Sequence, residues 1–173
     1  MHLPIENSFW HKNIAHMNIK LIVVSKTDIP YLQIGIDEYV GRLRHYCDFE
    51  LVVIPALKNM GKASPEEIKE REGQLILKQL EKVDTTMLLD EHGLEYTSMG
   101  FSEHLQKQMN SGIRTLAFVI GGAFGFSSAV NAAATHKISL SRMTFNHQMV
   151  RLFFVEQLYR AFTILHHEKY HNQ

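Results

Sequence analysis

Asp90, Glu91 and His92 form the first group of residues whose types and spacing could do chemistry. Carboxylates beside an imidazole can accept and release protons, so the group could serve in acid–base catalysis. Neighbouring carboxylates at the end of an apolar run are also common as solvated or capping groups. The sequence alone leaves both interpretations open.

A glycine-rich segment, Gly121-Gly122-Ala123-Phe124-Gly125, follows an apolar run further along the chain. It matches neither the dinucleotide pattern G-x-G-x-x-G nor a phosphate loop, which would need Gly-Lys-Ser/Thr. Such glycines either provide the positive φ of a tight turn or let a ligand approach the backbone. A third segment, residues 140–145, follows a short apolar run in the same way.

The C-terminal third is basic although the whole chain has a net charge of zero. A basic end can bind a polyanion such as RNA, or it can be a solvated face. Glu156 and Arg160 are spaced for an ion pair on one helix, while a substrate-facing arginine is the alternative. His167 and His171 would share a helix face, but a metal site needs three or four converging ligands, so we expect no metal.

Strand and helix patterns alternate along the chain and must position these groups. Ser64, Pro65 and Glu67 form a capping box with proline at the first helical position, which marks one helix start clearly. Alternating strands and helices predict an α/β fold, a parallel sheet with helices on both faces. The expected strands are residues 19–25, 49–55, 85–90, 115–120 and 138–140, and the expected helices are 31–45, 64–83, 101–110, 127–136 and 147–167.

In such sheets ligands bind beyond the carboxyl ends of the strands, which are the positions of the three segments described above. The segment after the third strand is expected to be a loop through His92 and Gly93. Three loops at one edge could line one crevice. The last helix is apolar on nearly all sides, so we expect it to pack against a partner subunit as well as the sheet.

The 173 residues, 45% hydrophobic and 21% charged, are typical of one folded domain. Residues 1–16 show no periodicity and are expected to be a mobile extension, with a single domain over residues 17–173. No apolar run reaches the roughly 20 residues of a membrane helix. The lone Cys47, expected on an early helix and in the core, fits a reducing compartment. We therefore expect a soluble, cytoplasmic protein.

Four segments together resemble the RlmH family, bacterial methyltransferases of the SPOUT class that act on N3 of a pseudouridine in 23S ribosomal RNA. They are IGGAFGFS at 120–127, SLSRMTFNHQMVR at 139–151, EQLYRAF at 156–162 and EKYH at 168–171. The resemblance covers residues 17–173. Many relatives have proline where this chain has Asn146, so we expect a less rigid loop there.

The resemblance implies a C-terminal trefoil knot, in which the end of the chain threads through a loop, and a homodimer. It implies S-adenosylmethionine as cofactor and large-subunit RNA of the assembled ribosome as partner, with no membrane and no metal. The cofactor-binding residues that it implies are Leu89, Gly121, Leu140, Ser141, Arg142, Met143, Thr144 and Phe145.

Methyl transfer to N3 needs alignment of the base with the methyl–sulfur bond and loss of the N3 proton. The candidates for these catalytic tasks are Tyr170, His171, Arg160, Arg142 and His147. We expect Tyr170 to orient the base, His171 to contact it, and Arg142 or Arg160 to hold phosphate. The alternatives are a SPOUT methyltransferase acting on tRNA or another ribosomal RNA site, or a ribosome-binding module without catalysis.

Overall fold

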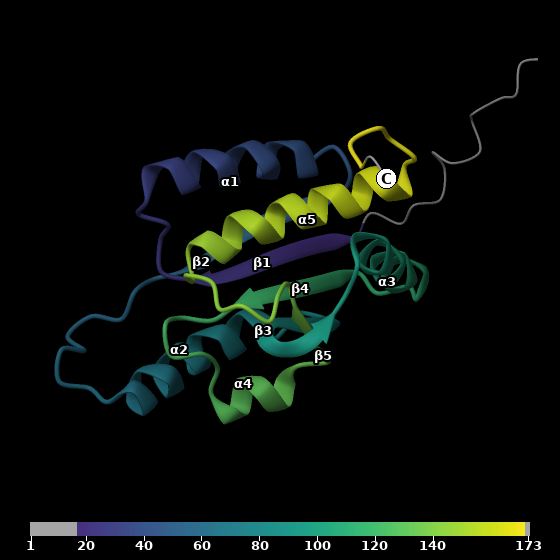
Figure 1. Cartoon of the computed structure of the whole chain (residues 1–173). Helices are drawn as coiled ribbons and strands as arrows, with labels where there is room; N and C mark the ends of the chain where they lie inside the picture. Colours follow the sequence, from purple (N-terminus) through teal and green to yellow (C-terminus); the bar gives the residue numbers. More distant parts are fainter. Residues whose placement is uncertain (1–16, 172–173) are drawn as a thin grey trace, which may run out of the picture.

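The computed structural model describes residues 17–171, which form one five-stranded sheet with all strands parallel (Figure 1). The strand order is β2-β1-β4-β3-β5. The strands are β1 (Asn18–Val24), β2 (Asp48–Ile54), β3 (Thr85–Glu95), β4 (Thr115–Ile120) and β5 (His136–Ser139). The predicted parallel α/β sheet is confirmed. The expected mobile extension, residues 1–16, lies outside the described residues.

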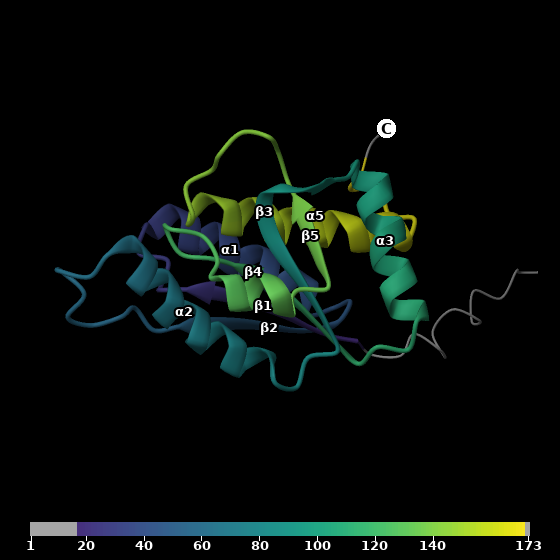
Figure 2. The same ribbon diagram turned by 90° about the horizontal axis from the view of Figure 1, so that it is seen from below.

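Helices cover both faces of the sheet, as Figures 1 and 2 show. One face carries α1 (Pro30–Leu43), α3 (Ser98–Asn110) and α5 (Met149–Leu165), and the other carries α2 (Pro65–Leu80) and α4 (Ser128–Ala133). Side chains of β1 alternate between the two cores, with Leu21 and Val23 in one and Ile22 and Val24 in the other. No helix among residues 17–171 is long and apolar enough to cross a membrane.

The start of α2 is the element boundary that the sequence predicts best. Ser64 Oγ accepts a hydrogen bond from the Glu67 amide at 3.2 Å, and Glu67 Oε2 accepts one from the Ser64 amide at 2.8 Å. Two amides that the helix cannot satisfy internally are thereby paired. The helix ends at Leu80, three residues before the predicted end.

The largest departure from the predicted elements is in β3, which continues to Glu95 instead of ending at residue 90. The predicted loop through His92 and Gly93 is therefore wrong. Leu89 and Leu94 both pair with Ile138, so residues 90–93 bulge out while the ladder resumes at Leu94 and Glu95. Only long-range pairing with β5 extends the strand across the bulge, and that pairing leaves no local signal.

Other boundaries move by a few residues. Helix α3 begins at Ser98 because Thr97 Oγ1 accepts the Gly100 amide at 3.0 Å, ahead of the predicted start at residue 101. Ser127 caps α4, which ends at Ala133 so that β5 can begin at His136. Cys47 is buried as expected, but it lies in the turn after α1 and not on the helix.

Helix α5 packs between α1 and α3 over the sheet. The approach to α1 is close, because a Cβ at Gly35 would lie 2.9 Å from a Leu152 methyl carbon. The outer side of α5 leaves Phe153 44% exposed. The expected contact of this helix with a partner subunit stays a prediction, as does the trefoil knot.

Candidate functional site

The ends of three strands bring the three chemistry-bearing segments to one edge of the sheet. Leu89 of β3 pairs with Ile120 of β4 on one side and with Ile138 of β5 on the other. The segments that follow these residues therefore begin next to one another: the bulge at 90–93, the glycine loop at 121–127 and the loop at 140–148. Leu89, Gly121 and residues 140–145 are thus close together, as the crevice hypothesis requires.

Gly93 sets the shape of the bulge. A Cβ at this position would lie 2.6 Å from both the backbone nitrogen and the carbonyl carbon of Ile138, closer than real Cβ contacts. Any side chain would push β3 and β5 apart at this point. The glycine is required by the backbone approach of two strands, and the sequence could not distinguish that from a simple turn.

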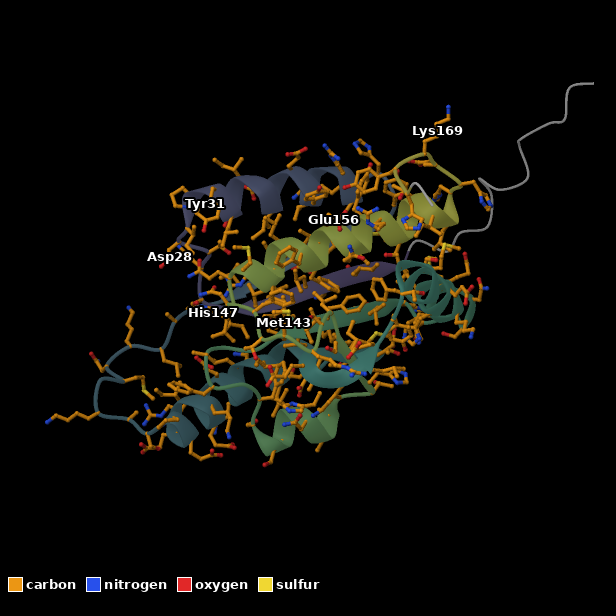
Figure 3. The ribbon with its side chains drawn as sticks, viewed as in Figure 1. Asp28, Tyr31, Met143, His147, Glu156 and Lys169 are labelled. Carbon is orange, nitrogen blue, oxygen red and sulfur yellow. The ribbon has the colours of Figure 1, made fainter. Side chains whose placement is uncertain are left out.

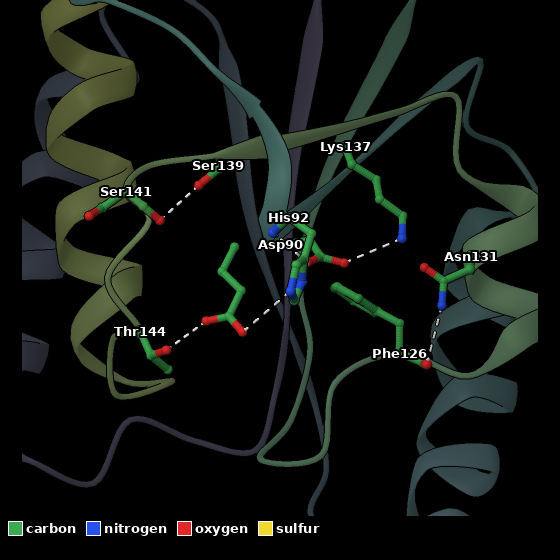
Figure 4. A network of polar contacts seen from close by, with 9 residues as sticks. Asp90, His92, Phe126, Asn131, Lys137, Ser139, Ser141 and Thr144 are labelled. Atoms are coloured by element: carbon green, nitrogen blue, oxygen red, sulfur yellow. Dashed lines mark hydrogen bonds and ion pairs between the residues drawn. The ribbon is translucent and has the colours of Figure 1, made fainter.

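Asp90 is the centre of a polar network on the bulge (Figure 4). Its Oδ1 accepts the His92 amide at 2.9 Å and lies 3.2 Å from His92 Nδ1, while its Oδ2 accepts Lys137 Nζ at 3.3 Å. Burial would raise the pKa of the Asp90 carboxyl, but the hydrogen bonds from His92 and Lys137 outweigh it and hold the pKa below its usual value. Asp90 is therefore an ionised anchor rather than a proton carrier.

Two carboxylates of β3 hold the loop at 140–148. Glu91 Oε2 accepts Thr144 Oγ1 at 2.6 Å, and Glu95 Oε1 accepts Arg142 Nε at 2.7 Å. Ser141 Oγ also accepts the Met143 amide at 2.9 Å. No local sequence pattern predicts this role of Glu91 and Glu95, because each carboxylate and its partner are about fifty residues apart.

The glycine loop rests on α2. A Cβ at Gly122 would lie 2.4 Å from Glu72 Oε2, so the carboxylate occupies the space that a side chain would need. Gly125 has a φ of +79°, which completes the turn at the tip. Burial raises the pKa of Glu72, whose Oε2 has no hydrogen-bond partner among the described residues. The tight turn is thus observed at Gly125, and Gly122 makes a close approach to Glu72, while ligand approach to this backbone stays a prediction.

The start of α5 is fixed by buried polar groups. Arg151 is 1% exposed and donates hydrogen bonds to the carbonyls of Val24, Ser25 and His147. Burial and the Arg151 guanidinium lower the pKa of His147, so its imidazole stays neutral. Asn146 Oδ1 accepts the Gln148 amide at 2.8 Å, which gives this residue a capping role in the loop.

The tail candidates form a second group. Arg160 is paired with Glu156, so the ion pair left open by the sequence is confirmed. Tyr170 Oη donates to the same carboxylate at 3.0 Å, and the Arg160 guanidinium lies over the Tyr170 ring at 4.8 Å. His171 Nδ1 lies 3.4 Å from Arg160 Nη1. Burial and hydrogen bonds to Tyr39 and Glu156 raise the pKa of Tyr170. Its hydroxyl therefore stays protonated and is not available as a base.

The structure does not bring the tail group to the strand-end group within one chain. In Figure 3, Met143 and His147 lie at one end of α5 and Lys169 lies at the other. Arg142 and His147 belong to the first group, and Arg160, Tyr170 and His171 to the second. His167 and His171 lie beyond the helix end at Leu165. No cluster of three His, Cys, Asp or Glu residues among residues 17–171 could hold a metal ion.

A pocket of about 160 Å³ opens beside the loop at 140–148. Aromatic and apolar side chains form most of its wall, a surface suited to the flat base of a nucleoside. It is lined by Tyr96, Thr97, Phe101, Ile138, Ser139, Leu140, Phe145, Phe153 and Gln157. Leu140 and Phe145 belong both to this wall and to the expected cofactor residues. Their apolar side chains and the backbone of the loop are the kind of surface that an adenosyl group needs.

The sequence profile of one protein family, described as "Predicted SPOUT methyltransferase", matches residues 17–171. The chain belongs to the SPOUT methyltransferase family. Relatives named "Ribosomal RNA large subunit methyltransferase H" match 91% of this chain and 100% of their own length, with 57% identity in Flavobacterium johnsoniae and 46% in Bacteroides fragilis. The resemblance to the RlmH family is thereby confirmed.

Solved structures show the same fold at low sequence identity. A probable methyltransferase from Bordetella pertussis has a TM-score of 0.54 and 14% identity, covering 86% of this chain and 98% of its own. A probable methylase family protein from Haemophilus influenzae has a TM-score of 0.51 and 12% identity, covering 93% and 72%. These likenesses show that the arrangement of sheet and helices is shared with other solved proteins.

Proposed function

We propose that this SPOUT methyltransferase transfers a methyl group from S-adenosylmethionine to N3 of a pseudouridine in large-subunit ribosomal RNA. The observation that carries the proposal is the 57% identity, over its whole length, to a relative named for methylation of that RNA. A ribosomal substrate would place the protein in the cytoplasm. Residues 17–173 would act as a single domain.

The cofactor would lie against the strand-end loops. Leu89 and Leu140 offer partly buried apolar surface, and Gly121 lies beside them at the start of the glycine loop, where it is itself buried against Gly125 and Phe126. The remaining expected contacts are Ser141, Arg142, Met143, Thr144 and Phe145. When bound, S-adenosylmethionine supplies a methyl group already activated by its sulfonium, so the chain's own tasks are orientation of the base and management of the N3 proton. The trefoil knot would hold these loops together.

The tail group would act in a homodimer. Arg160 lies in the second half of α5 and contacts Tyr170 and His171, whereas the loop at 140–148 leads into the first turn of that helix. A second protomer is therefore the economical way to complete a site. The mutual bonds of these three residues would keep Tyr170 ready to orient the base, His171 to contact it and Arg160 to bind phosphate. Arg142 and His147 would act from the strand-end group.

The test is methyl transfer from labelled S-adenosylmethionine to intact ribosomes lacking this modification, to free large subunits and to tRNA. Nucleosides are identified by mass after digestion. Label in N3-methylpseudouridine of large-subunit RNA would support the proposal. Label in tRNA or another ribosomal nucleoside would favour a different SPOUT substrate, and cofactor binding without label in any RNA would favour a non-catalytic ribosome-binding module.

A further inference from the structure

The proposed reaction needs a group that accepts the N3 proton, and few side chains at the strand-end edge can do so. Asp90 is held ionised by its partners, and Arg142 is a cation paired with Glu95. His147 is half-buried beside the Arg151 guanidinium, which makes it a weak base. In the tail group, the Tyr170 hydroxyl already donates to Glu156.

His92 is the other imidazole at the strand-end edge, and Asp90 fixes how its ring is presented. Nδ1 of His92 lies 3.2 Å from Asp90 Oδ1, an ionised oxygen that can only accept. The shorter of the two carboxylate contacts places the hydrogen of the neutral ring on Nδ1, because Glu91 Oε1 lies further away, 4.0 Å from Nε2. Nε2 then keeps its electron pair. The side chain of His92 is 82% exposed, so a substrate can reach that nitrogen.

The support beneath this pair is rigid. Asp90 is also held by Lys137 of the neighbouring strand, and the His92 amide donates to the same carboxylate. Gly93 then locks the bulge against the backbone of Ile138. A carboxylate that orients an imidazole in this way is the arrangement that general-base catalysis uses on unrelated folds.

The position of the pair fits the proposed substrate. Asp90 follows Leu89, which is paired with Ile120, so the bulge lies beside the start of the glycine loop. Glu91, between the two residues of the pair, holds Thr144 of the cofactor loop. Figure 4 shows Asp90 and His92 drawn between Thr144 on one side and Phe126 of the glycine loop on the other.

We infer that His92, oriented by Asp90, is the general base that removes the N3 proton of the target pseudouridine. The inference rests on the proposed function. The N3 proton passes to Nε2 of His92, the N3 electron pair bonds to the methyl carbon, and the sulfur keeps the electron pair of the methyl–sulfur bond. His92 then returns the proton to water.

The charged groups that face His92 are Asp90 and Glu91 on its own strand and Lys137 on β5. The loop at 140–145 adds Arg142, which is paired with Glu95, and the glycine loop contains no charged residue. The charged groups around the ring therefore carry a net negative charge.

The test compares wild type, His92→Asn, His92→Ala and the control His136→Asn on ribosome substrate. His136 is an exposed histidine at the opposite end of the neighbouring strand β5. We expect kcat to fall about 100-fold in the two His92 variants, the usual contribution of a general base, with little change in the ribosome KM. Added imidazole should restore part of the His92→Ala rate.

Two readouts do not depend on turnover. Calorimetry should give His92→Asn a dissociation constant for S-adenosylmethionine within about twofold of wild type, because His92 is proposed to contact the RNA and not the cofactor. Nitrogen-correlated NMR of the wild type should find the neutral His92 ring protonated at Nδ1, and Asp90→Asn should disturb that preference.

Three results would overturn the inference. These are a kcat within threefold of wild type in His92→Asn, a parallel loss of kcat and cofactor affinity without imidazole rescue, and an Nε2-protonated ring. A wild type that methylates no RNA would instead overturn the proposed function, and this role of His92 with it. A loss in His136→Asn as large as in His92→Asn would show a general stability effect and also count against the inference.

Discussion

Arg151 shows how much of the site depends on a side chain that no ligand needs to touch. The guanidinium is buried and bonds the carbonyls of Val24 and Ser25 at the end of β1 to the first turn of α5. Ser25 has a φ of 64°, so the bonds also hold a strained turn. In the sequence, Arg151 only interrupts an apolar helix, and its spacing does not reveal its partners.

Replacing Arg151 by Met should lower the free energy of unfolding by about 3 kcal/mol, because several buried carbonyls would lose their donors. Urea unfolding measures the change. Arg44→Met, an exposed arginine at the end of α1, should shift stability by no more than about 0.5 kcal/mol. Equal effects of the two substitutions would show that the buried hydrogen bonds contribute little.

Gly93 allows the backbones of β3 and β5 to approach each other closely. Gly93→Ala should destabilise the protein by at least about 2 kcal/mol, because the methyl group would meet the Ile138 backbone at 2.6 Å. Gly41→Ala is the matched control, since that helical glycine has nothing within 4 Å. It should stabilise α1 by about 0.5–1 kcal/mol, and thermal unfolding of both variants would decide the matter.

At the scale of elements, local signals predicted the strands, the α2 cap and the parallel sheet. Continuous apolar runs such as residues 115–120 identify strands covered on both faces. The capping box of Ser64 identifies a helix start from residues only three positions apart. The extension of β3 past Gly93 depends on β5, about forty residues away, so no window of sequence contains its cause. For the same reason, no window of sequence predicts the hydrogen bonds of Glu91 and Glu95 to the loop at 140–148.

Asp84 ties the starts of β3 and β4 together and makes that joint sensitive to pH. Its Oδ2 accepts the amides of Arg114 and Thr115, each at 2.8 Å, and these bonds lower the pKa of the carboxyl. A carboxyl with a lowered folded pKa stabilises the protein above its unfolded pKa of about 4, and this stabilisation is lost as the pH falls further. Asp84→Asn should therefore show a shallower loss of stability on acidification than wild type.

Urea midpoints between neutral pH and about pH 3 measure this effect, with stability linked to the protons bound in each state. Asp37→Asn, on the exposed side of α1, is the control and should follow the wild-type curve. An unchanged slope in Asp84→Asn would show that the bonds to Arg114 and Thr115 do not act through ionisation.

At the scale of the whole molecule, the sequence provided the candidate residues but not their division into two distant groups, and their roles stay predictions. The predicted helix 147–167 contains both His147 and Arg160, yet only the structure shows how far apart the ends of α5 lie, with His147 before its first turn and Lys169 beyond its last. Ile34 on α1 and Phe153 on α5 are exposed apolar side chains on the helices of the same sheet face, and a second copy packed there would cover them. A homodimer would both cover that surface and bring one tail to the other protomer's loops.

A heterodimer of two inactive variants separates this arrangement from a site built within one chain. Arg142→Ala removes a strand-end residue and His171→Ala removes a tail residue, and each homodimer should lose most of its methylation activity. In a dimer that carries one chain of each kind, isolated through two different tags, one site would combine an intact loop group with an intact tail. Its activity should return to about half that of the wild-type dimer, because one of two equivalent sites is whole. If each chain builds its own site, both sites carry a defect and the heterodimer stays as inactive as its parents.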